Sequence, residues 1–206
     1  MGFHDMKRLL IPIVLGLMPV AAAADEITSI YSELDLKNCK QLALFEDEGE
    51  GGEWLCPGIK DYDVHVWEGD LRSYVGFGKE APAQCVSAET FGAFNSLGPR
   101  VEWRMKDGKP FATILRWLTQ PSDANGNPGK QNWLVVTKLD GKDACHSAYV
   151  DTKYTDANEV ARQRADERAA TFNCAKDMPE IFSSLGGVAT DYASGMPCPG
   201  GPYREE

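Results

Sequence analysis

Two Asp-Gly pairs, each between apolar segments, constrain the fold of this chain more than any other feature. Asp107-Gly108 and Asp140-Gly141 both lie within residues 101–150, and the segments that flank them are rich in β-branched and aromatic residues. Asp-Gly readily adopts the positive φ angles of a tight hairpin turn. Residues 101–150 are therefore predicted to form two hairpins, a four-stranded meander against which the rest of the chain packs.

Tight two-residue turns also predict the register of the two hairpins. The first turn pairs Trp103 with Ala112 and places Arg116 on the same face of the sheet as Trp103. The second turn pairs Val135 with His146. Both faces of the strand that contains Arg116 are largely apolar, so we expect a central strand that is covered on both sides.

Further hairpins and one long helix are predicted outside the meander. Alternating segments predict hairpins from 41–45 with 54–56 and from 62–67 with 71–77. Short helical turns are expected after the capping residues Ser32 and Ser87, the second reaching Phe94. The fold class is predicted to be α+β, an antiparallel β-sheet of about eight strands built from hairpins, curled or two-layered, with one C-terminal helix packed across a face.

The long helix is predicted from Asp156 to about Phe172, because small residues recur there at helical spacing. The expected buried stripe consists of Ala157, Ala161, Ala165, Ala169 and Phe172. Alanine at these positions favours close approach to a sheet. On the outer face, Arg162 and Asp166 have the spacing of an i,i+4 ion pair.

The first 24 residues have the pattern of a secretory signal peptide. Lys7-Arg8 precedes an apolar stretch, and Ala22 and Ala24 form a small-residue cleavage site. The alternative, a membrane anchor, is disfavoured because the apolar stretch is short, so no stable anchor is expected after cleavage. We expect a single disulfide-stapled domain at 25–174, and a loosely ordered tail rich in glycine and proline at 175–206.

Six cysteines follow the predicted signal peptide, and an even number in this context indicates disulfides formed in an oxidising compartment. The periplasm or the cell exterior is therefore the expected location. Many pairings are open, and sequence proximity favours two short local loops over the others. The predicted bridges are Cys39–Cys56, Cys145–Cys174 and, by default, Cys85–Cys198.

The net charge of −10 argues against binding to nucleic acid and favours a cationic partner. An acidic, glycine-rich turn over 46–53 and the aromatic Trp67 are the candidate partner-binding features. The acidic residues are Glu46, Asp47, Glu48, Glu50 and Glu53. The alternative interpretation of this turn is a solvated hairpin tip, because clustered like charges favour water.

No catalytic motif, metal-binding motif or cofactor is predicted from the residues. Asp123 to Asn127 resembles the start of a calcium loop, but no glutamate closes the loop at the twelfth position. Arg116 and His146 interrupt apolar strands and, with Trp103, are the candidate ligand-binding residues. The alternatives are an internal ion pair of Arg116, for example with Glu102, and a histidine satisfied within the core.

Residues 32–174 resemble a group of small secreted proteins common in alphaproteobacteria. The resemblance is carried by GEWLCPG (52–58), EGDLR (68–72), LGPRVEWR (97–104), KPFATILRW (109–117) and FNC (172–174). It implies a Gram-negative envelope setting, assigns no activity and transfers no catalytic residue to this chain.

The function predicted from these features is a periplasmic or secreted, non-enzymatic binding protein. Its partner would be another envelope protein or a small ligand. A specific form of this hypothesis is an inhibitor or immunity-type protein directed at a basic cell-wall hydrolase. The alternative is an envelope hydrolase that uses carboxylates, since a chain with 31 acidic residues brings some of them close together by chance.

Overall fold

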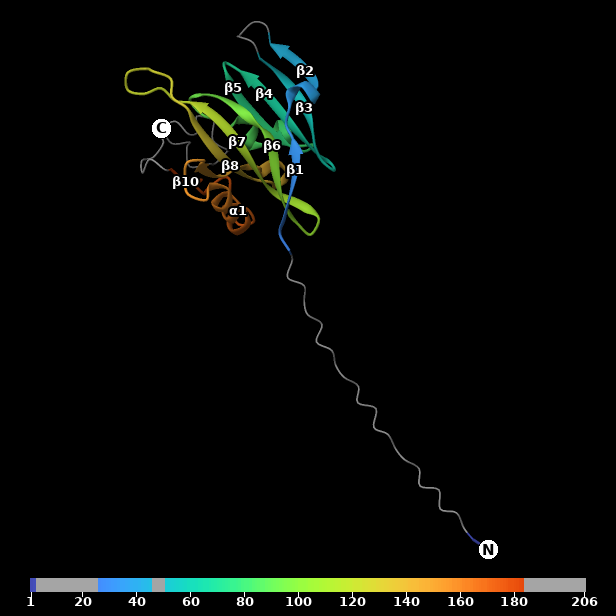
Figure 1. Ribbon diagram of the computed structural model, residues 1–206. Helices are drawn as coiled ribbons and strands as arrows, with labels where there is room; N and C mark the ends of the chain where they lie inside the picture. Colours follow the sequence, from blue (N-terminus) through green and yellow to red (C-terminus); the bar gives the residue numbers. More distant parts are fainter. Residues whose placement is uncertain (3–25, 46–50, 184–206) are drawn as a thin grey trace.

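Two β-sheets packed face to face form the body of the protein, and the one α-helix of the described residues lies across part of the outer face of the larger sheet (Figure 1). The computed structural model describes residues 1–2, 26–45 and 51–183. Sheet A has the order β1-β6-β7-β8-β9-β10, with β1 (Thr28–Glu33), β6 (Phe94–Lys106), β7 (Lys109–Gln120), β8 (Gln131–Lys138), β9 (Cys145–Asp151) and β10 (Glu180–Phe182). Sheet B has the order β2-β3-β4-β5, with β2 (Lys40–Phe45), β3 (Gly51–Ile59), β4 (Tyr62–Gly69) and β5 (Arg72–Phe77). The predicted fold class, hairpins in two layers with one C-terminal helix, is confirmed.

The main core lies between the two sheets and is built largely from aromatic rings of sheet A. Trp103, Trp117, Trp133 and Tyr149 are each at most 1% exposed. They pack against valine, phenylalanine and cysteine side chains of sheet B, which include Cys56, Val64, Val66, Val75 and Phe77. Large rings at these positions fill the gap between two packed sheets, and their burial is the main source of stability on this side.

The second core lies between sheet A and α1 (Ala157–Arg168), and its residues are small. The predicted alanine stripe is confirmed, because Ala161, Ala165 and Ala169 are at most 1% exposed and face short aliphatic residues of β7, β8 and β9. The predicted ion pair between Arg162 and Asp166 does not form. Both side chains instead reach across to sheet A.

The predicted registers of both meander hairpins are wrong, for different reasons. In the first, a bulge between Arg104 and Met105 shifts the pairing, so that Trp103 lies opposite Thr113 and not Ala112. In the second, the connection is not a tight two-residue turn at Asp140-Gly141. A 3₁₀ helix, η4 (Gly141–Asp143), lengthens the connection, and His146 pairs with Thr137. Bulges and short helical turns leave little trace in an alternating pattern.

The two short helical turns predicted upstream are also corrected. Ser32 lies inside β1, and the turn that follows is a 3₁₀ helix, η1 (Leu36–Asn38), capped by the carboxylate of Asp35. The helix predicted from Ser87 to Phe94 is replaced by two 3₁₀ helices, η2 (Ala81–Ala83) and η3 (Cys85–Ala88), and Phe94 begins β6. The predicted tail contributes β10, which pairs in parallel with β9.

Two of the predicted disulfides, Cys39–Cys56 and Cys145–Cys174, are confirmed. The first ties the start of β2 to β3, and the second joins β9 to the segment after α1. The third predicted bridge includes Cys198, which lies outside the described residues, as do almost all residues of the predicted signal peptide. Disulfides indicate an oxidising, extracytoplasmic compartment. Among the described residues, no helix is long and apolar enough to cross a membrane.

Candidate functional site

The three predicted ligand-binding residues do not share a surface. Trp103 and His146 lie in the core between the sheets and are 0% and 1% exposed. Arg116 is half-buried and lines a groove on the opposite face of sheet A, beside α1. The bulge near Met105 shifts β6 by one residue relative to β7, so Trp103 shares a face with Thr113 and not with Ala112. Arg116 therefore points to the side of sheet A opposite to Trp103. Only Arg116 remains a candidate on an accessible surface.

A second irregularity in β6 brings another arginine next to Arg116. The pairing of β6 with β7 jumps from Leu97–Trp117 to Val101–Leu115, so three residues of β6 lie opposite Arg116 alone. These residues are Gly98, Pro99 and Arg100. A Cβ at Gly98 would lie 2.8 Å from Cβ of Arg116, so glycine permits this close approach. Bulges of this kind redirect side chains, here that of Arg100.

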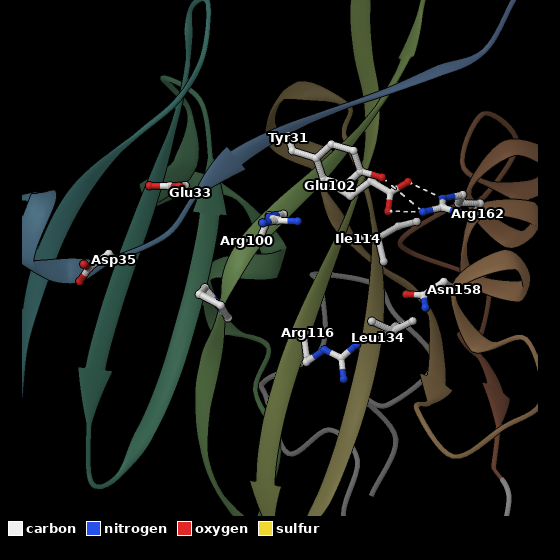
Figure 2. Close-up of a pocket in the computed structure, with 11 residues that line it drawn as sticks. Tyr31, Glu33, Asp35, Arg100, Glu102, Ile114, Arg116, Leu134, Asn158 and Arg162 are labelled. Atoms are coloured by element: carbon white, nitrogen blue, oxygen red, sulfur yellow. Dashed lines mark hydrogen bonds and ion pairs between the residues drawn. The ribbon is translucent and has the colours of Figure 1, made fainter.

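The arginine groove, as we name this site, has a volume of about 670 Å³ and lies between β1, β6, β7 and the start of α1 (Figure 2). Its apolar bed is formed by Pro99, Ile114 and Leu134. Its polar lining consists of Tyr31, Glu33, Asp35, Arg100, Glu102, Arg116, Asn158 and Arg162. Asn158 belongs to the first turn of α1, where the helix dipole favours negative charge.

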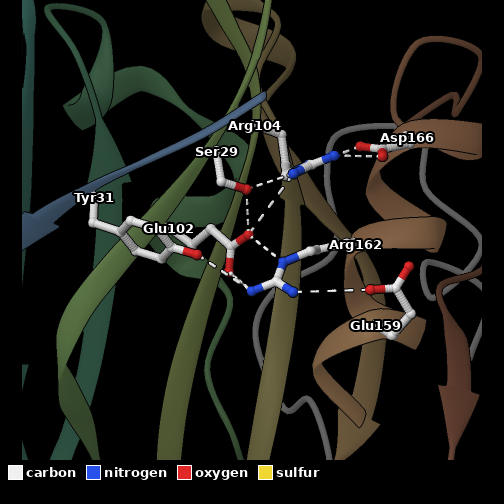
Figure 3. Close-up of polar contacts among 7 residues, drawn as sticks. All are labelled: Ser29, Tyr31, Glu102, Arg104, Glu159, Arg162 and Asp166. Atoms are coloured by element: carbon white, nitrogen blue, oxygen red, sulfur yellow. Dashed lines mark hydrogen bonds and ion pairs between the residues drawn. The ribbon is translucent and has the colours of Figure 1, made fainter. Parts of the chain in front are cut away.

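Glu102 is held in a network that joins β1, β6 and α1 (Figure 3). Its carboxylate accepts hydrogen bonds from Arg162 at 2.6 Å and from the hydroxyl of Ser29 at 2.5 Å. Burial alone would raise the pKa of Glu102, but the bonds from Arg162 and Ser29, with the charges of Arg162 and Arg104, lower it overall. Asp166 of α1 holds Arg104 through bonds of 2.8 and 2.5 Å. The network fixes α1 as one wall of the groove.

Arg116 is not part of this network. Among the described residues its guanidinium makes no ion pair and no hydrogen bond, and the predicted partner Glu102 is bound to Arg162 instead. Arg100 stacks over the ring of Tyr31 at 5.9 Å and lies across the strands from Glu33, with no ion pair between them in the described part of the chain. Arg100 and Arg116 therefore line the groove without an ion-pair partner among the described residues, and the carboxylates of Glu33 and Asp35 lie in the same lining.

His146 lies in a closed polar cluster on the other face of sheet A. Its Nδ1 is 2.9 Å from the hydroxyl of Tyr149, and its backbone N–H donates to Glu89. Burial lowers the pKa of His146 to about 3. Burial also raises the pKa of Glu89 to about 7, although the hydrogen bond from His146 acts in the opposite direction. His146 is packed against the rings of Trp117 and Tyr149 and is 1% exposed, so its imidazole is not accessible to a ligand.

The predicted partner-binding residues are partly brought together. Glu53 lies directly across the strands from Trp67 on the outer face of sheet B. His65 lies between them, with its ring centroid 4.3 Å from that of Trp67 and its Nε2 3.0 Å from Glu53. Trp67 is half-buried. Glu46, Asp47, Glu48 and Glu50 lie outside the described residues.

The described part of the chain contains no group of three or more acidic, histidine or cysteine side chains arranged to hold a metal ion. The carboxylate of Asp123 instead accepts backbone hydrogen bonds from Asn125 and Asn127. The fold and site define a two-sheet protein with a helix-flanked, arginine-lined groove. No protein-family model, curated protein or solved structure matches the chain.

Sequence reasoning found Arg116 but missed Arg100 and Asn158. Arg100 follows Gly98-Pro99, and a glycine and a proline within an otherwise apolar strand are signals for a bulge. That signal was present in the sequence. No local signal predicts that the start of α1 would lie beside β7, because this contact joins residues far apart in the chain.

Proposed function

We propose that this protein is a non-enzymatic binding protein of the periplasm or the cell exterior, and that the arginine groove holds a small anionic ligand. The observation that carries the proposal is the uncompensated guanidinium of Arg116 in a groove. A buried or half-buried arginine is normally paired with a carboxylate, and this chain has an excess of acidic residues to supply one. A carboxylate or phosphate group of a ligand would complete the missing pair through bidentate hydrogen bonds.

The apolar residues of the groove indicate that the ligand has an apolar portion besides its anionic group. Ile114, Leu134 and Pro99 form an apolar bed beside the arginines, so a ligand with a short apolar portion next to its anionic group fits better than a bare anion. The volume of about 670 Å³ suits a small molecule. The resemblance to secreted alphaproteobacterial proteins and the disulfides support an envelope setting.

Binding of two named probes tests this function. Hexanoate combines a carboxylate with an apolar chain, and inorganic phosphate is an anion without one. We expect hexanoate to bind more tightly by calorimetric titration, and Arg116→Gln or Arg100→Gln to weaken its affinity about tenfold or more. Lys130→Gln, which removes an exposed charge outside the groove, is the matched control and is expected to change nothing. Equal affinities of Arg116→Gln and wild type, or no binding of either probe, would exclude the groove as an anion site.

A second candidate function is docking to a basic cell-wall hydrolase as an inhibitor or immunity-type protein. The observation that favours it is the cross-strand pair of Glu53 and Trp67 on the outer face of sheet B, within a chain of net charge −10. Salt-sensitive inhibition of a basic lysozyme, lost in Trp67→Ala and weakened in Glu53→Gln, is expected. Unchanged hydrolase activity at stoichiometric excess contradicts this function. The carboxylate-hydrolase alternative stays a prediction.

A further inference from the structure

A second cavity lies at the end of the two-sheet body, where three connections between strands meet. Its volume is about 640 Å³, and it shares no residue with the arginine groove. The connections are the β3–β4 turn, the β6–β7 turn and the start of the β8–β9 connection, and the segment after β5 closes the fourth side. Small-molecule sites commonly occupy the mouth between packed sheets. We name this site the end cavity.

Aromatic and aliphatic side chains that belong to the main core form the floor of the end cavity. Tyr62 and Phe77 line it, and both rings pack edge-on against Trp103, with centroid distances of 6.2 and 5.6 Å. Pro110 and Leu139 add aliphatic surface beside them. Phe77 and Trp103 are only 1% and 0% exposed, so the floor is closely packed, and an apolar group that entered here would lie over it beside Tyr62 and Leu139.

The walls are held in place by hydrogen bonds that need no ligand. The buried side chain of Gln84 accepts a hydrogen bond from the backbone N–H of Phe77 at 2.9 Å and donates one to the backbone carbonyl of Phe77 at 2.7 Å. It also donates to the backbone carbonyl of Gly141 at 2.9 Å. Lys60 donates to the carbonyl of Gly108 at 3.1 Å and so joins two of the turns. A site that is already held open loses little entropy when it binds, which favours affinity.

The rim of the end cavity carries three lysines and three acidic residues, and more of the acids than of the lysines are held in ion pairs. Two of its three acidic residues are paired with lysines outside the lining, Asp140 with Lys138 at 3.1 Å and Glu80 with Lys142 at 3.9 Å. Lys79 and Lys109 line the rim and have no carboxylate partner among the described residues. The apolar floor and the cationic rim are together complementary to an amphiphilic anion.

We propose that the end cavity binds a small molecule with an aromatic or branched aliphatic body and one anionic group. The body lies on Tyr62, Phe77 and Leu139, and the anionic group faces Lys79 and Lys109 at the rim. This site is independent of the arginine groove, because the two are lined by different strands and different cations.

The probe for this proposal is 8-anilinonaphthalene-1-sulfonate, which joins an aromatic body to a sulfonate. The titrations use the Arg116→Gln background, which weakens anion binding in the arginine groove. In this background we expect saturable binding of one probe per folded protein, measured by probe fluorescence and by energy transfer from tryptophan. Binding is expected to shift the backbone amide resonances of Gly78, Gly108 and Gly141, which surround the cavity. Near-ultraviolet circular dichroism verifies that each variant retains its tertiary packing.

Three variants locate the probe. Leu139→Glu places a carboxylate in the cavity, where it repels the sulfonate and removes apolar surface, and is expected to weaken binding about tenfold or more. The double variant Lys79→Gln/Lys109→Gln is expected to weaken it about threefold to tenfold and to reduce its salt dependence. Lys130→Gln in the same background leaves it unchanged, because this exposed charge lies outside both cavities. Unshifted glycine resonances, undiminished binding to folded Leu139→Glu, or no binding by the Arg116→Gln background would overturn the proposal. Equal affinity for the uncharged analogue N-phenyl-1-naphthylamine would overturn its anionic part.

Discussion

Both faces of sheet A are covered, but the two covers are built from residues of very different size. Toward sheet B the sheet presents Trp103, Trp117 and Trp133, whose rings fill the space between two sheets. Toward α1 it presents short aliphatic residues, which pack against the alanines of α1. Small residues let a helix lie close to a sheet, while large rings set a wider spacing.

The consequence of this difference is the arginine groove. α1 has 12 residues and packs mainly against β8 and β9, so it covers only part of its face of sheet A. The rest, where β7 meets the bulge of β6, stays open beside the first turn of the helix and carries Arg116. On the other face Trp103, Trp117 and Trp133 are at most 1% exposed, so the centre of the sheet is closely covered in the described part of the chain. One face of sheet A therefore provides stability, and the other provides an accessible polar site.

The largest effect expected from this comparison is on the aromatic face. Trp103→Ala removes a ring that is 0% exposed, contacts Tyr62 and Phe77, and donates a hydrogen bond to Ser32. We expect a loss of about 3–5 kcal/mol in the free energy of unfolding. Urea denaturation measures it. The control Leu44→Ala, at a residue 57% exposed, should cost less than about 0.5 kcal/mol. Equal costs for the two variants would mean that this face is not the stabilising one.

The aromatic face also predicts an unusual dependence of stability on pH. Because burial raises the folded-state pKa of Glu89 from 4.5 to about 7, its stabilising contribution is complete below 4.5 and is lost as pH rises through 7. The loss is on the order of 3 kcal/mol. Glu89→Gln cannot ionise, so its stability relative to wild type should increase by that amount between pH 4.5 and 8.

His146 gives the opposite trend and serves as the internal control. Burial lowers its folded-state pKa from 6.5 to about 3, so its stabilising contribution is present above pH 6.5 and is lost as pH falls towards 3. Unfolding in urea at several pH values separates the two groups. If the difference between Glu89→Gln and wild type were the same at every pH, the raised pKa of Glu89 would be refuted.

On the helix face we expect a smaller effect from Glu102→Gln. This change removes the negative charge that is paired with both Arg162 and Arg104. However, Arg162 is 34% exposed, so its guanidinium can be hydrated instead. A cost of about 1–2 kcal/mol at neutral pH is expected. Since the folded-state pKa of Glu102 is lowered, the wild-type advantage is present above pH 4.5 and disappears at more acidic pH.

Thermal unfolding at pH 7 and pH 3 measures this advantage. Glu159→Gln, which changes an exposed carboxylate 3.9 Å from the same Arg162, is the matched control and should have almost no effect. An advantage that persists undiminished at pH 3 would show that the charge of Glu102 does not stabilise the contact between α1 and sheet A.

The same two faces show how far the sequence alone determines the structure. The alanine stripe of α1 and the hairpin strands follow from periodicity, and two disulfides follow from proximity, so these predictions are confirmed. The register is not local information. The bulge between Arg104 and Met105 reverses which face Trp103 and Arg116 occupy relative to each other, because a one-residue shift changes every side chain beyond it. The sequence therefore identified Arg116 as unusual but paired it with the wrong neighbours.

The smallest effect on stability is expected from Arg116→Gln, which is best compared with Arg104→Gln on the same face of sheet A. Arg104 and Arg116 are both arginines of sheet A that point towards the side of α1. Arg104 is bound by Asp166, whereas Arg116 has no ion pair among the described residues. Glutamine keeps most of the aliphatic stem that packs on Gly98. We therefore expect Arg116→Gln to lie within about 0.5 kcal/mol of wild type, and Arg104→Gln to cost about 2 kcal/mol or more.

Urea denaturation of the two variants, with hexanoate titrations on the same samples, separates stability from binding. Replacing a residue with a structural role lowers the stability of the protein, whereas replacing a residue that only binds a ligand lowers the affinity for that ligand. Arg104→Gln should show the first behaviour and Arg116→Gln the second. If Arg116→Gln instead destabilised the protein as much as Arg104→Gln, Arg116 would have a structural partner in the folded protein. The charge in the groove would then be compensated, and the argument for an anionic ligand would fail.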